Sequence, residues 1–579
     1  MLKRKRRQLG VTLATALVLL PLMAPAAHAK TTDTQTAIAP HPGEYGFYVD
    51  QYKHNVKENQ TTSTNPGLGL LSNFYQLWSP TKGKLNPAIL DQSMAIVAKA
   101  TQTRTQAEVE RSFFTDQRTL QYGMLSGLGP YENAFKENGN TETWYPKMPD
   151  KPIPGDTPWS TARWADPNSK LGPMVKLVNQ ARQSPYCDTG VVKQIFKYVR
   201  PYRQSPETVK QNLYLVNVMA TAPANDYDFP SGHGTAAFEV GETMAYAFPE
   251  RFQQLLTRSS EMGYDRLLAG RHTPLAVMGS RMIGTAVAAS VLNDPANAAL
   301  KKQAYQNAHS DALQKSPLVD RHDEFGNYAQ NRKDFRYRMT YGLPQIGDTT
   351  RAMRVPKGAE VLLETRLPYL SAAQRRAVLA TTGLPSGYPV LDDAEGWGRL
   401  DLFSAANGFG KFLDTTKVTM NAAKGSFSAR DTWRNDIAGR GGLIKQGTGT
   451  LTLAGHNTFT GGVQVNGGRV ILTTRDAAGR GPLKVQRGTL TAKAPLTIQK
   501  GYQQAKRGTL ALTVTKATAL KIRGKAQLAG TLKLTTKHLK NHQKIVVFGQ
   551  HRGKFSRVQG LPKGWHVVYH AHHLEAVRG

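Results

Sequence analysis

The sequence predicts a multidomain protein in which an all-α helical-bundle domain is followed by an all-β, solenoid-like domain. The chain has 579 residues, which is too many for a single hydrophobic core. Apolar residues recur at helical spacing between about residues 86 and 290, whereas short Gly-Thr-Leu alternations recur about every twenty residues after about residue 425. We therefore divide the chain into residues 1–29, 30–75, 76–415 and 416–579.

Residues 1–29 have the three parts of a secretory signal peptide. Lys3-Arg4-Lys5-Arg6-Arg7 precedes an apolar run, and the small residues of Ala27-His28-Ala29 follow it. A retained membrane anchor is the alternative, which Pro21 and the shortness of the run disfavour. No later segment reads as long and apolar enough to cross a bilayer. We therefore expect an exported protein with no transmembrane segment after signal cleavage.

Residues 30–75 are polar and rich in Thr, Pro, Gly and Asn, which predicts an arm ordered by contact or a loose linker. The helical domain is predicted for residues 76–415, beginning with a helical pattern over about residues 86–114. A proline-rich insertion follows over residues 128–172, and it is either functional or a surface excursion. A further helical piece is predicted near residues 372–380.

A helix predicted over residues 191–199 carries two cations. Pro201 stops this helix. Lys193 and Arg200 are seven residues apart, about two turns, so their side chains would leave the same face. Two cations on one face either hold an anion or form a solvated basic surface.

The segment Phe229-Pro230-Ser231-Gly232-His233-Gly234 precedes an apolar, helix-compatible run. We expect the backbone N–H groups of Ser231 and Gly232, the Ser231 hydroxyl and the His233 ring to face one point at a helix N-terminus. The orphan N–H groups and the helix dipole favour an anion there. The same residue types are also common in ordinary turns, so the function must be judged from partner residues elsewhere in the chain.

Those partners lie between residues 257 and 290. Arg266 stands on a helical segment that Gly270 breaks, and Thr273-Pro274 supplies the N-cap and first-turn proline of a helix to about residue 290. His272 lies at the start of that helix, where a lone histidine is more often structural. Further on, the acidic, Gly-rich block 392–403 is interpreted as an ordered loop that closes the domain, not as a core element.

Residues 416–579 are predicted to form a basic β-solenoid. Within residues 421–579, 27 Lys and Arg residues stand against four acidic residues, a net charge of +23. Such an excess implies a polyanionic partner, and for an exported protein an anionic cell-envelope polymer is favoured over nucleic acid. The single cysteine, Cys187, excludes an intrachain disulfide.

The three motifs have a recognisable order. The first motif is Lys193 followed after six residues by Arg200-Pro201, the second is Pro230-Ser231-Gly232-His233, and the third is Arg266 followed after five residues by His272. This order and spacing resemble the signature of the phosphatidic acid phosphatase type 2 / vanadium haloperoxidase superfamily. The resemblance covers about residues 70–415 and is greatest to bacterial class A non-specific acid phosphatases. It implies a secreted phosphoric monoester hydrolase that needs neither a metal nor another cofactor.

The resemblance also implies a role for each matched residue. His272 would attack phosphorus to give a phosphohistidine, and His233 would protonate the departing alkoxide and then activate water. The phosphoryl oxygens would be held by Lys193, Arg200, Arg266, the Ser231 side chain and the Gly232 amide.

Two positions depart from the family pattern. Asp265 stands where a serine is usual, and Ala276 stands where an aspartate usually orients the nucleophilic imidazole. Without that carboxylate His272 loses a fixed tautomer, unless a water, a carbonyl or another carboxylate replaces it. The alternatives are therefore a catalytically decayed cell-surface binding or adhesion protein, or a vanadate-dependent haloperoxidase with the same oxyanion pocket.

Two features remain near the C-terminus. Residues 442–462 resemble the autotransporter-associated β-strand repeat of passenger domains, which implies a stalk or adhesive module. His570, His572 and His573 are candidate metal ligands. We expect them to lie on a frayed tail that binds no metal specifically.

Overall fold

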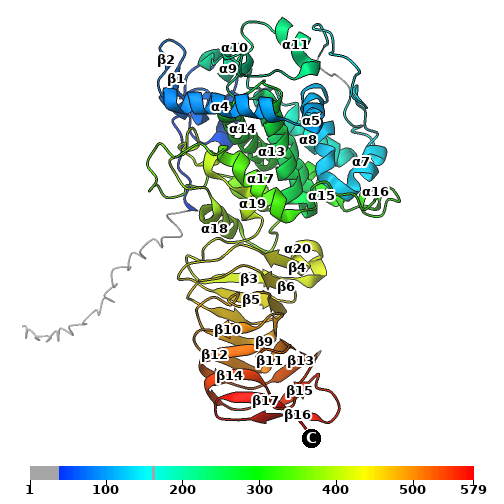
Figure 1. Cartoon of the computed structure of the whole chain (residues 1–579), viewed down its shortest axis with the longest axis vertical. Coiled ribbons are helices and arrows are strands. Elements are labelled where there is room, and N and C mark those ends of the chain that lie inside the picture. Colours follow the sequence, from blue (N-terminus) through cyan, green and yellow to red (C-terminus); the bar gives the residue numbers. More distant parts are fainter. Residues whose placement is uncertain (1–37, 159–162, 537) are drawn as a thin grey trace, which may run out of the picture.

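The computed structural model describes residues 38–158, 163–536 and 538–579, so the predicted signal peptide lies outside the described residues. Figure 1 shows a helical domain joined end to end with an elongated β-solenoid, whose far end holds the C-terminus. The predicted fold class, helices followed by a β-solenoid, is confirmed.

The helices of the first domain, between which short 3-10 segments lie, are α2 (Tyr48–Gln51), α3 (Pro66–Leu70), α4 (Pro87–Thr103), α5 (Gln106–Gln117), α6 (Leu120–Met124), α7 (Glu132–Asn138), α8 (Gly172–Arg182), α9 (Gly190–Phe196), α10 (Pro201–Gln204), α11 (Val216–Thr221), α12 (Gly232–Ala247), α13 (Phe252–Leu268), α14 (Pro274–Asn293), α15 (Ala298–Ala308), α16 (Asp311–Gln314), α17 (Tyr328–Thr340), α18 (Ala372–Thr382) and α19 (Leu402–Ala405).

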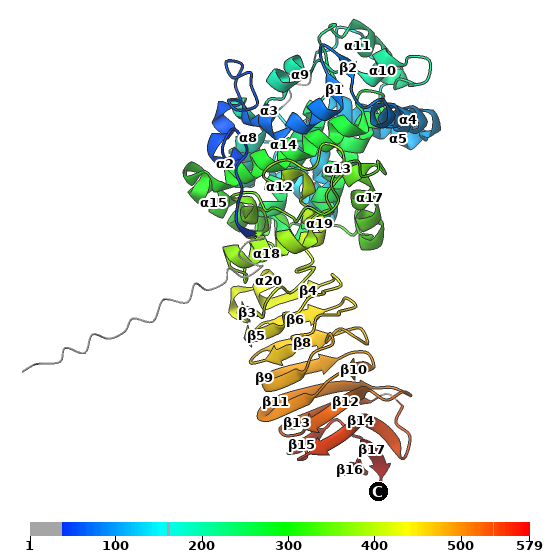
Figure 2. The ribbon, with the colours of Figure 1, turned by 90° about the vertical axis from the view of Figure 1, so that its left-hand side faces the viewer.

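Three long helices, α12, α13 and α14, form the centre of this domain (Figure 2). Glycines let them approach closely: a Cβ at Gly284 of α14 would lie 2.6 Å from the Thr235 carbonyl oxygen of α12. Helix α14 is long and apolar enough to cross a membrane, contrary to the expectation for later segments, but all of its apolar window is buried inside the domain. The close packing fixes the starts of α12 and α14 relative to each other.

The segment 38–75 contributes to the same core. Tyr48, Leu68 and Phe74 are fully buried or nearly so. The Phe74 ring stacks on Phe229 at a centroid distance of 3.8 Å, directly before the Ser231 motif. These contacts make the N-terminal segment part of the support of that motif.

The block 392–403 is buried, although its composition argued against a core element. Asp393 accepts hydrogen bonds from the backbone N–H groups of Gly396 and Gly398, both at 2.7 Å. Arg281 of α14 donates to the Gly398 carbonyl at 2.7 Å, and Trp397 is completely buried. The carboxylate and the glycines serve a tight internal turn, so the block is an ordered loop, as expected, but it belongs to the buried core, contrary to the prediction.

The strands are the small hairpin β1 (Trp78–Ser79) and β2 (Gly83–Lys84), and in the second domain β3 (Thr416–Met420), β4 (Arg430–Trp433), β5 (Leu443–Gly447), β6 (Thr450–Leu453), β7 (Val463–Val465), β8 (Arg469–Leu472), β9 (Leu483–Ala492), β10 (Leu496–Ile498), β11 (Tyr502–Val514), β12 (Leu520–Gln527), β13 (Thr531–Thr536), β14 (Gln543–Arg552), β15 (Arg557–Gln559), β16 (Trp565–Tyr569) and β17 (His573–Arg578), with a short helix, α20 (Ser426–Ala429), between β3 and β4.

The solenoid is a stack of parallel strands in which equivalent residues of successive turns pair. On one face, Leu451 pairs with Val470, which continues to Leu490, Leu510 and Leu532, and all five side chains are buried. The spacing of about twenty residues is therefore the length of one turn. At the far end β14, β17 and β16 pair antiparallel.

The two domains are joined by buried polar contacts. Asp431 of β4 forms a two-pronged ion pair with Arg366, with N···O distances of 2.8 and 3.0 Å, and also hydrogen bonds with the Tyr369 hydroxyl. Trp433 donates its indole N–H to Tyr369 at 2.8 Å. The helical domain thus covers the first turn of the solenoid.

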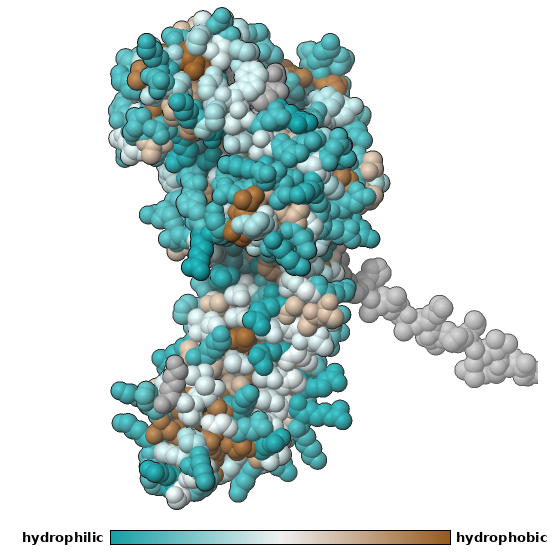
Figure 3. All heavy atoms as spheres, turned by 90° about the vertical axis from the view of Figure 1, so that its right-hand side faces the viewer, coloured by the Kyte–Doolittle hydropathy of each residue, from teal (hydrophilic) through white to brown (hydrophobic). Residues whose placement is uncertain are grey.

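Figure 3 shows mainly hydrophilic residues over this face of the helical domain, and long hydrophilic side chains project from the solenoid. Apolar residues gather on the same face toward the C-terminal end of the solenoid. The charged side chains of the solenoid therefore lie on its surface, while its interior is filled mainly by aliphatic side chains.

Candidate functional site

The start of helix α12 forms one wall of the site. Ser231 is the N-cap residue, and its hydroxyl oxygen accepts a hydrogen bond from the Gly234 N–H at 3.1 Å. The Ser231 N–H donates to the Ala276 carbonyl at 3.0 Å, so it does not face a ligand as predicted. Gly232 and His233 both line a cavity. The first turn therefore presents the Gly232 N–H and the His233 ring.

Lys193 and Arg200 reach the site by a route that the sequence did not predict. Helix α9 ends at Phe196, because Lys197 adopts a left-handed φ of 51°. Arg200 follows in extended backbone as the N-cap residue of α10, so the two cations do not share a helical face. Lys193 donates through Nζ to the Tyr227 carbonyl at 2.8 Å. Both cations instead converge on the segment before Ser231.

His272 is held at the start of α14 and is only 1% exposed. Its Nδ1 lies 2.7 Å from Oδ1 of Asp228, whose Oδ2 accepts a hydrogen bond from the Thr273 hydroxyl at 2.7 Å. Arg200 Nη1 hydrogen bonds to His272 Nε2. A guanidinium only donates, so Nε2 carries the lone pair and the proton of the neutral ring is on Nδ1. Asp228 thus supplies the carboxylate that Ala276 lacks.

A second buried carboxylate, Asp116 on α5, gathers cations on the other side. Its Oδ2 lies 2.7 Å from Arg266 Nη1 and 3.1 Å from Arg271 Nε, and its carbonyl oxygen lies 3.2 Å from His233 Nε2. Arg266 is 1% exposed, and its Nε has no hydrogen-bond acceptor among the described residues. Buried donors without acceptors are costly. An anion at this point would supply both acceptors and charge.

The two imidazoles are kept neutral by their surroundings. Burial, followed by the charge of Arg200, holds the pKa of His272 well below its usual value of 6.5. Burial and Arg266 lower the pKa of His233 in the same way. Burial and Arg200 also depress the pKa of Lys193. All three pKa values are lowered because the site is electropositive and poorly hydrated.

The pKa values of the two buried carboxylates are shifted in opposite directions. Burial raises the pKa of Asp228 to about 6, although the Thr273 hydrogen bond lowers it. Burial also raises the pKa of Asp116, but Arg271 and Arg266 outweigh this effect and hold it well below the usual range. Asp116 is therefore a permanent anion, whereas Asp228 is poised to titrate under mildly acidic conditions.

A cavity of about 860 Å³ opens beside Gly232 and His233. Its walls come from α5, α6, α8 and the segment 163–167, so the proline-rich insertion takes part in it. Glu239 of α12 also lines it; burial raises the pKa of this residue to about 8, and its Oε1 has no hydrogen-bond partner among the described residues. The cavity has both polar and apolar walls and is large enough for a small organic group.

The structure brings the predicted residues together around the starts of α12 and α14; they are Lys193, Arg200, Ser231, Gly232, His233, Arg266 and His272. Sequence reasoning missed Asp116 and Asp228. A signal for Asp228 existed, because Asp226 and Asp228 stand immediately before the Ser231 motif in a basic chain. Asp116 is over a hundred residues away and carried no such signal.

Two family models match the chain. Residues 183–299 match the PAP2 superfamily, a range that contains all seven predicted site residues and Asp228. Residues 443–472 match the passenger-associated-transport-repeat, a range that runs from the start of β5 to the end of β8.

Curated relatives are similar over shorter parts of their length. Neisserial autotransporter lipoprotein NalP of Neisseria meningitidis is 38% identical over 133 residues, which is 22% of this chain and 12% of that protein. An extracellular serine protease of Serratia marcescens is 27% identical over 288 residues, 43% of this chain and 24% of that protein. Serotype-specific antigen 1 of Mannheimia haemolytica is 27% identical over 202 residues, which is 34% of this chain and 20% of that protein. The chain thus matches less than a quarter of each of these relatives.

The predicted resemblance to both families is therefore confirmed for defined parts of the chain: the helical domain contains a PAP2 superfamily domain that includes the candidate site, and the solenoid contains a passenger-associated transport repeat.

Proposed function

We propose that the helical domain hydrolyses phosphate monoesters through a phosphohistidine intermediate on His272, without a metal. The observation that carries this proposal is the geometry of His272, whose Nδ1 is bound to Asp228 and whose Nε2 is directed at Arg200. A neutral imidazole with its proton held on one nitrogen has a nucleophilic lone pair on the other. The PAP2 superfamily, which includes phosphatases, supports the same reaction class.

In the first step Arg200 releases its hydrogen bond to His272 Nε2 and turns to the phosphoryl oxygens. The freed lone pair of Nε2 forms a bond to phosphorus while the P–O bond of the ester breaks. The leaving oxygen takes a proton from His233 at the mouth of the cavity, where the organic group is accommodated. A bound phosphate dianion offsets the surrounding cations and so favours the protonated form of His233. Water then attacks phosphorus, gives its proton to His233, and the P–N bond breaks.

The cations stabilise the charge of the transferring phosphoryl group. Arg266 has a buried Nε without an acceptor among the described residues, and Arg200 lies beside the attacking nitrogen. Positioned charge of this kind is the main catalytic contribution in phosphoryl transfer. We assign phosphate binding to Arg266, Arg200 and Lys193, together with the Ser231 hydroxyl and the Gly232 N–H.

Asp228 also bears on the alternative of a decayed enzyme. That alternative rested on Ala276, whose position leaves no carboxylate on helix α14 for the nucleophile. Asp228 offers a carboxylate to the same imidazole from the segment before α12, with a 2.7 Å contact to Nδ1. Loss of the family aspartate is therefore no argument for loss of activity in this chain.

The test is hydrolysis of a chromogenic aryl phosphate by the full chain in the presence of a chelator. We expect turnover that His272→Ala abolishes, with a covalent acid-labile phosphate trapped on the native protein. His309→Ala is the matched control, because His309 also pairs with a carboxylate, Glu250 at 3.1 Å, but on the domain surface. A parent chain without turnover, or a His272→Ala variant with full turnover, would contradict the proposal. Vanadate-dependent bromide oxidation by the parent would indicate the haloperoxidase alternative instead.

For the solenoid we propose retention of the enzyme outside the cytoplasm on an anionic cell-envelope polymer. A shallow groove of about 610 Å³ crosses successive turns and is lined by amide side chains and by the exposed Arg487 and Arg507. Amides and guanidinium groups together suit a polyanion with hydroxyl or carbonyl groups. The passenger repeat and the extracellular and autotransporter relatives support export.

A further inference from the structure

The C-terminal hairpin is an ordered part of the solenoid, contrary to the frayed tail expected from the sequence. Strand β17 pairs with β16 on one side, where Val568 lies opposite Glu575, and with β14 on the other, where Lys544 lies opposite Glu575. The turn is closed by a hydrogen bond from the His570 N–H to the His573 carbonyl at 2.9 Å. The backbone positions from which the side chains of this turn project are therefore well defined.

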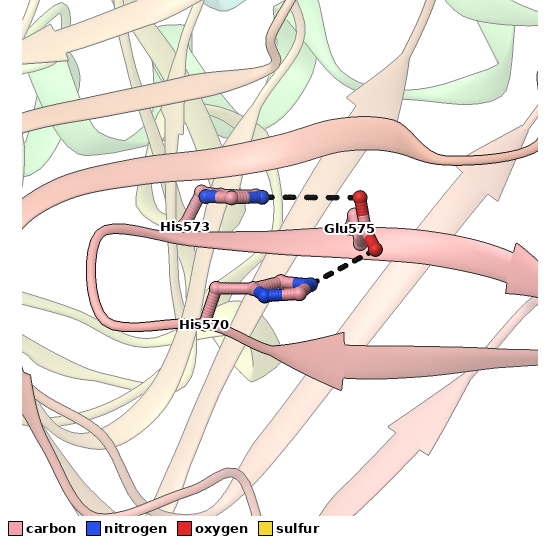
Figure 4. Close-up of side chains that lie close together, drawn as sticks. All are labelled: His570, His573 and Glu575. Atoms are coloured by element: carbon pink, nitrogen blue, oxygen red, sulfur yellow. Dashed lines mark hydrogen bonds and ion pairs between the residues drawn. The ribbon is translucent and has the colours of Figure 1, made fainter.

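Two neighbouring histidine rings, His570 and His573, face the carboxylate of Glu575, as Figure 4 shows. His570 Nε2 is 2.9 Å from Oε1 of Glu575, and His573 Nε2 is 3.8 Å from Oε2. The two rings stack with centroids 4.4 Å apart, and one donor atom from each of the three residues lies within 4.8 Å of the others. Both Nε2 atoms thus point to one carboxylate from the same side.

A third histidine reaches the same carboxylate from another turn. His542, directly before β14, places Nδ1 3.3 Å from Oε1 of Glu575. Among the described residues, the ion-pair partners of Glu575 are all histidines, although the domain has a large excess of Lys and Arg. This selection of imidazole around an isolated carboxylate is typical of a transition-metal site and unlike an ordinary surface salt bridge.

The geometry points to a site for one divalent transition-metal ion, ligated by His570, His573 and Glu575. Zinc binds imidazole nitrogen and carboxylate oxygen at about 2.0–2.2 Å, so tetrahedral ligand atoms lie roughly 3.3 Å apart. The separations of 2.9 and 3.8 Å fall on either side of that value, so small side-chain rotations would close the site. His542 is a positioning residue that holds the carboxylate.

An ion at this place would stabilise the last turn of the solenoid. Terminal repeats of a solenoid have a neighbour on one side only and need a cap. The three ligands come from the two ends of the β16–β17 turn and from β17 itself, and His542 extends the network to β14. The site lies at the opposite end of the solenoid from the helical domain (Figure 1), so it is separate from the proposed phosphatase centre.

The test uses the full chain after dialysis against a chelator, titrated with ZnCl₂ by calorimetry and with Co²⁺ by visible absorption. We expect one ion per chain and the intense Co²⁺ bands of a low-coordinate site. Glu575→Gln and the double variant His570→Ala/His573→Ala should each weaken Zn²⁺ binding by at least about tenfold, and His542→Ala by less. Zn²⁺ should also slow amide hydrogen exchange in β17 of the native chain.

His456→Ala is the matched control, because His456 forms an exposed pair with Asp476, at 2.9 Å, on an earlier turn. It should leave the Zn²⁺ affinity unchanged. The conservative His573→Gln variant separates ligand loss from misfolding: weakened binding with native circular dichroism supports the site. Absence of saturable binding by the native chain, or an equal loss in His456→Ala, would overturn the proposal.

Discussion

The two domains use charge in opposite ways. In the helical domain the decisive ionisable groups are buried and have specific partners: Asp228 contacts His272, and Asp116 contacts Arg266. In the solenoid a ladder of aliphatic side chains fills the interior, and cations such as Arg487 and Arg507 point outward. The comparison teaches that single substitutions decide the chemistry of the first domain, whereas the binding of the second depends on the sum of many residues.

The largest effect is expected at Asp228. Asp228→Asn keeps the size of the side chain but removes the charge that holds the His272 tautomer, so kcat for an aryl phosphate should fall roughly 10³–10⁴-fold. Steady-state kinetics with circular dichroism checks this. Asp323→Asn is the control, because Asp323 pairs with Arg251 away from the site. Ala276→Asp should bring no gain, because the nucleophile already has its carboxylate.

The second effect concerns the junction, where the solenoid relies on a specific buried ion pair. Asp431→Ala leaves the Arg366 guanidinium buried without its partner and should lower the free energy of unfolding by about 3–5 kcal/mol. Denaturant unfolding measures this loss. Replacing both residues together, Arg366→Met with Asp431→Leu, should cost much less, and an equal cost would contradict the assignment.

The third effect is a pH dependence. Because burial raises the pKa of Asp228 to about 6, its ionised form is present above that value and is lost as the pH falls through it. The ratio of kcat/KM between the native chain and Asp228→Asn should therefore fall about tenfold per pH unit below about 6. Taking the ratio cancels the ionisation of the substrate. A ratio independent of pH would show that Asp228 does not titrate there.

The smallest effect is expected on the solenoid surface. Arg487→Gln/Arg507→Gln should weaken retention on an anionic envelope polymer only a few-fold at low salt and make retention less dependent on salt. Elution from polymer-coated beads across a salt gradient measures this. Lys563→Gln, an exposed change outside the groove, should have a smaller effect, and no difference between these variants would remove the groove from the proposal.

The sequence predicted those features that depend on local periodicity. The repeat of about twenty residues predicted the solenoid turns, and Thr273-Pro274 predicted the start of α14, where Thr273 accepts the Ala276 N–H. The spacing of Lys193 and Arg200 predicted two cations that do lie near each other in the structure, but the argument from a shared helical face was wrong, because Lys197 ends the helix between them.

The partners of the site could not be predicted, because they depend on the tertiary fold. Asp116 meets Arg266 only after α5 packs against α13, a contact across 150 residues of sequence. The contact of Asp228 with His272 depends on the course of the backbone before Ser231. A hydrogen bond from the Asp228 N–H to the Tyr198 carbonyl, at 2.6 Å, fixes that course. The ordered hairpin at Glu575 similarly depends on pairing with β14, which no pattern within the last ten residues indicates.

The one-turn repeat of the solenoid has a consequence for reach. Each turn contacts only its neighbours, and parallel strands stack at about 4.8 Å, so a turn inserted or removed between β6 and β11 would shift the helical domain by about 5 Å. Such a change leaves the junction at Asp431 and the terminal hairpin untouched. Under the proposed function, the number of repeats sets the distance between the anchoring surface and the substrates that the helical domain can reach.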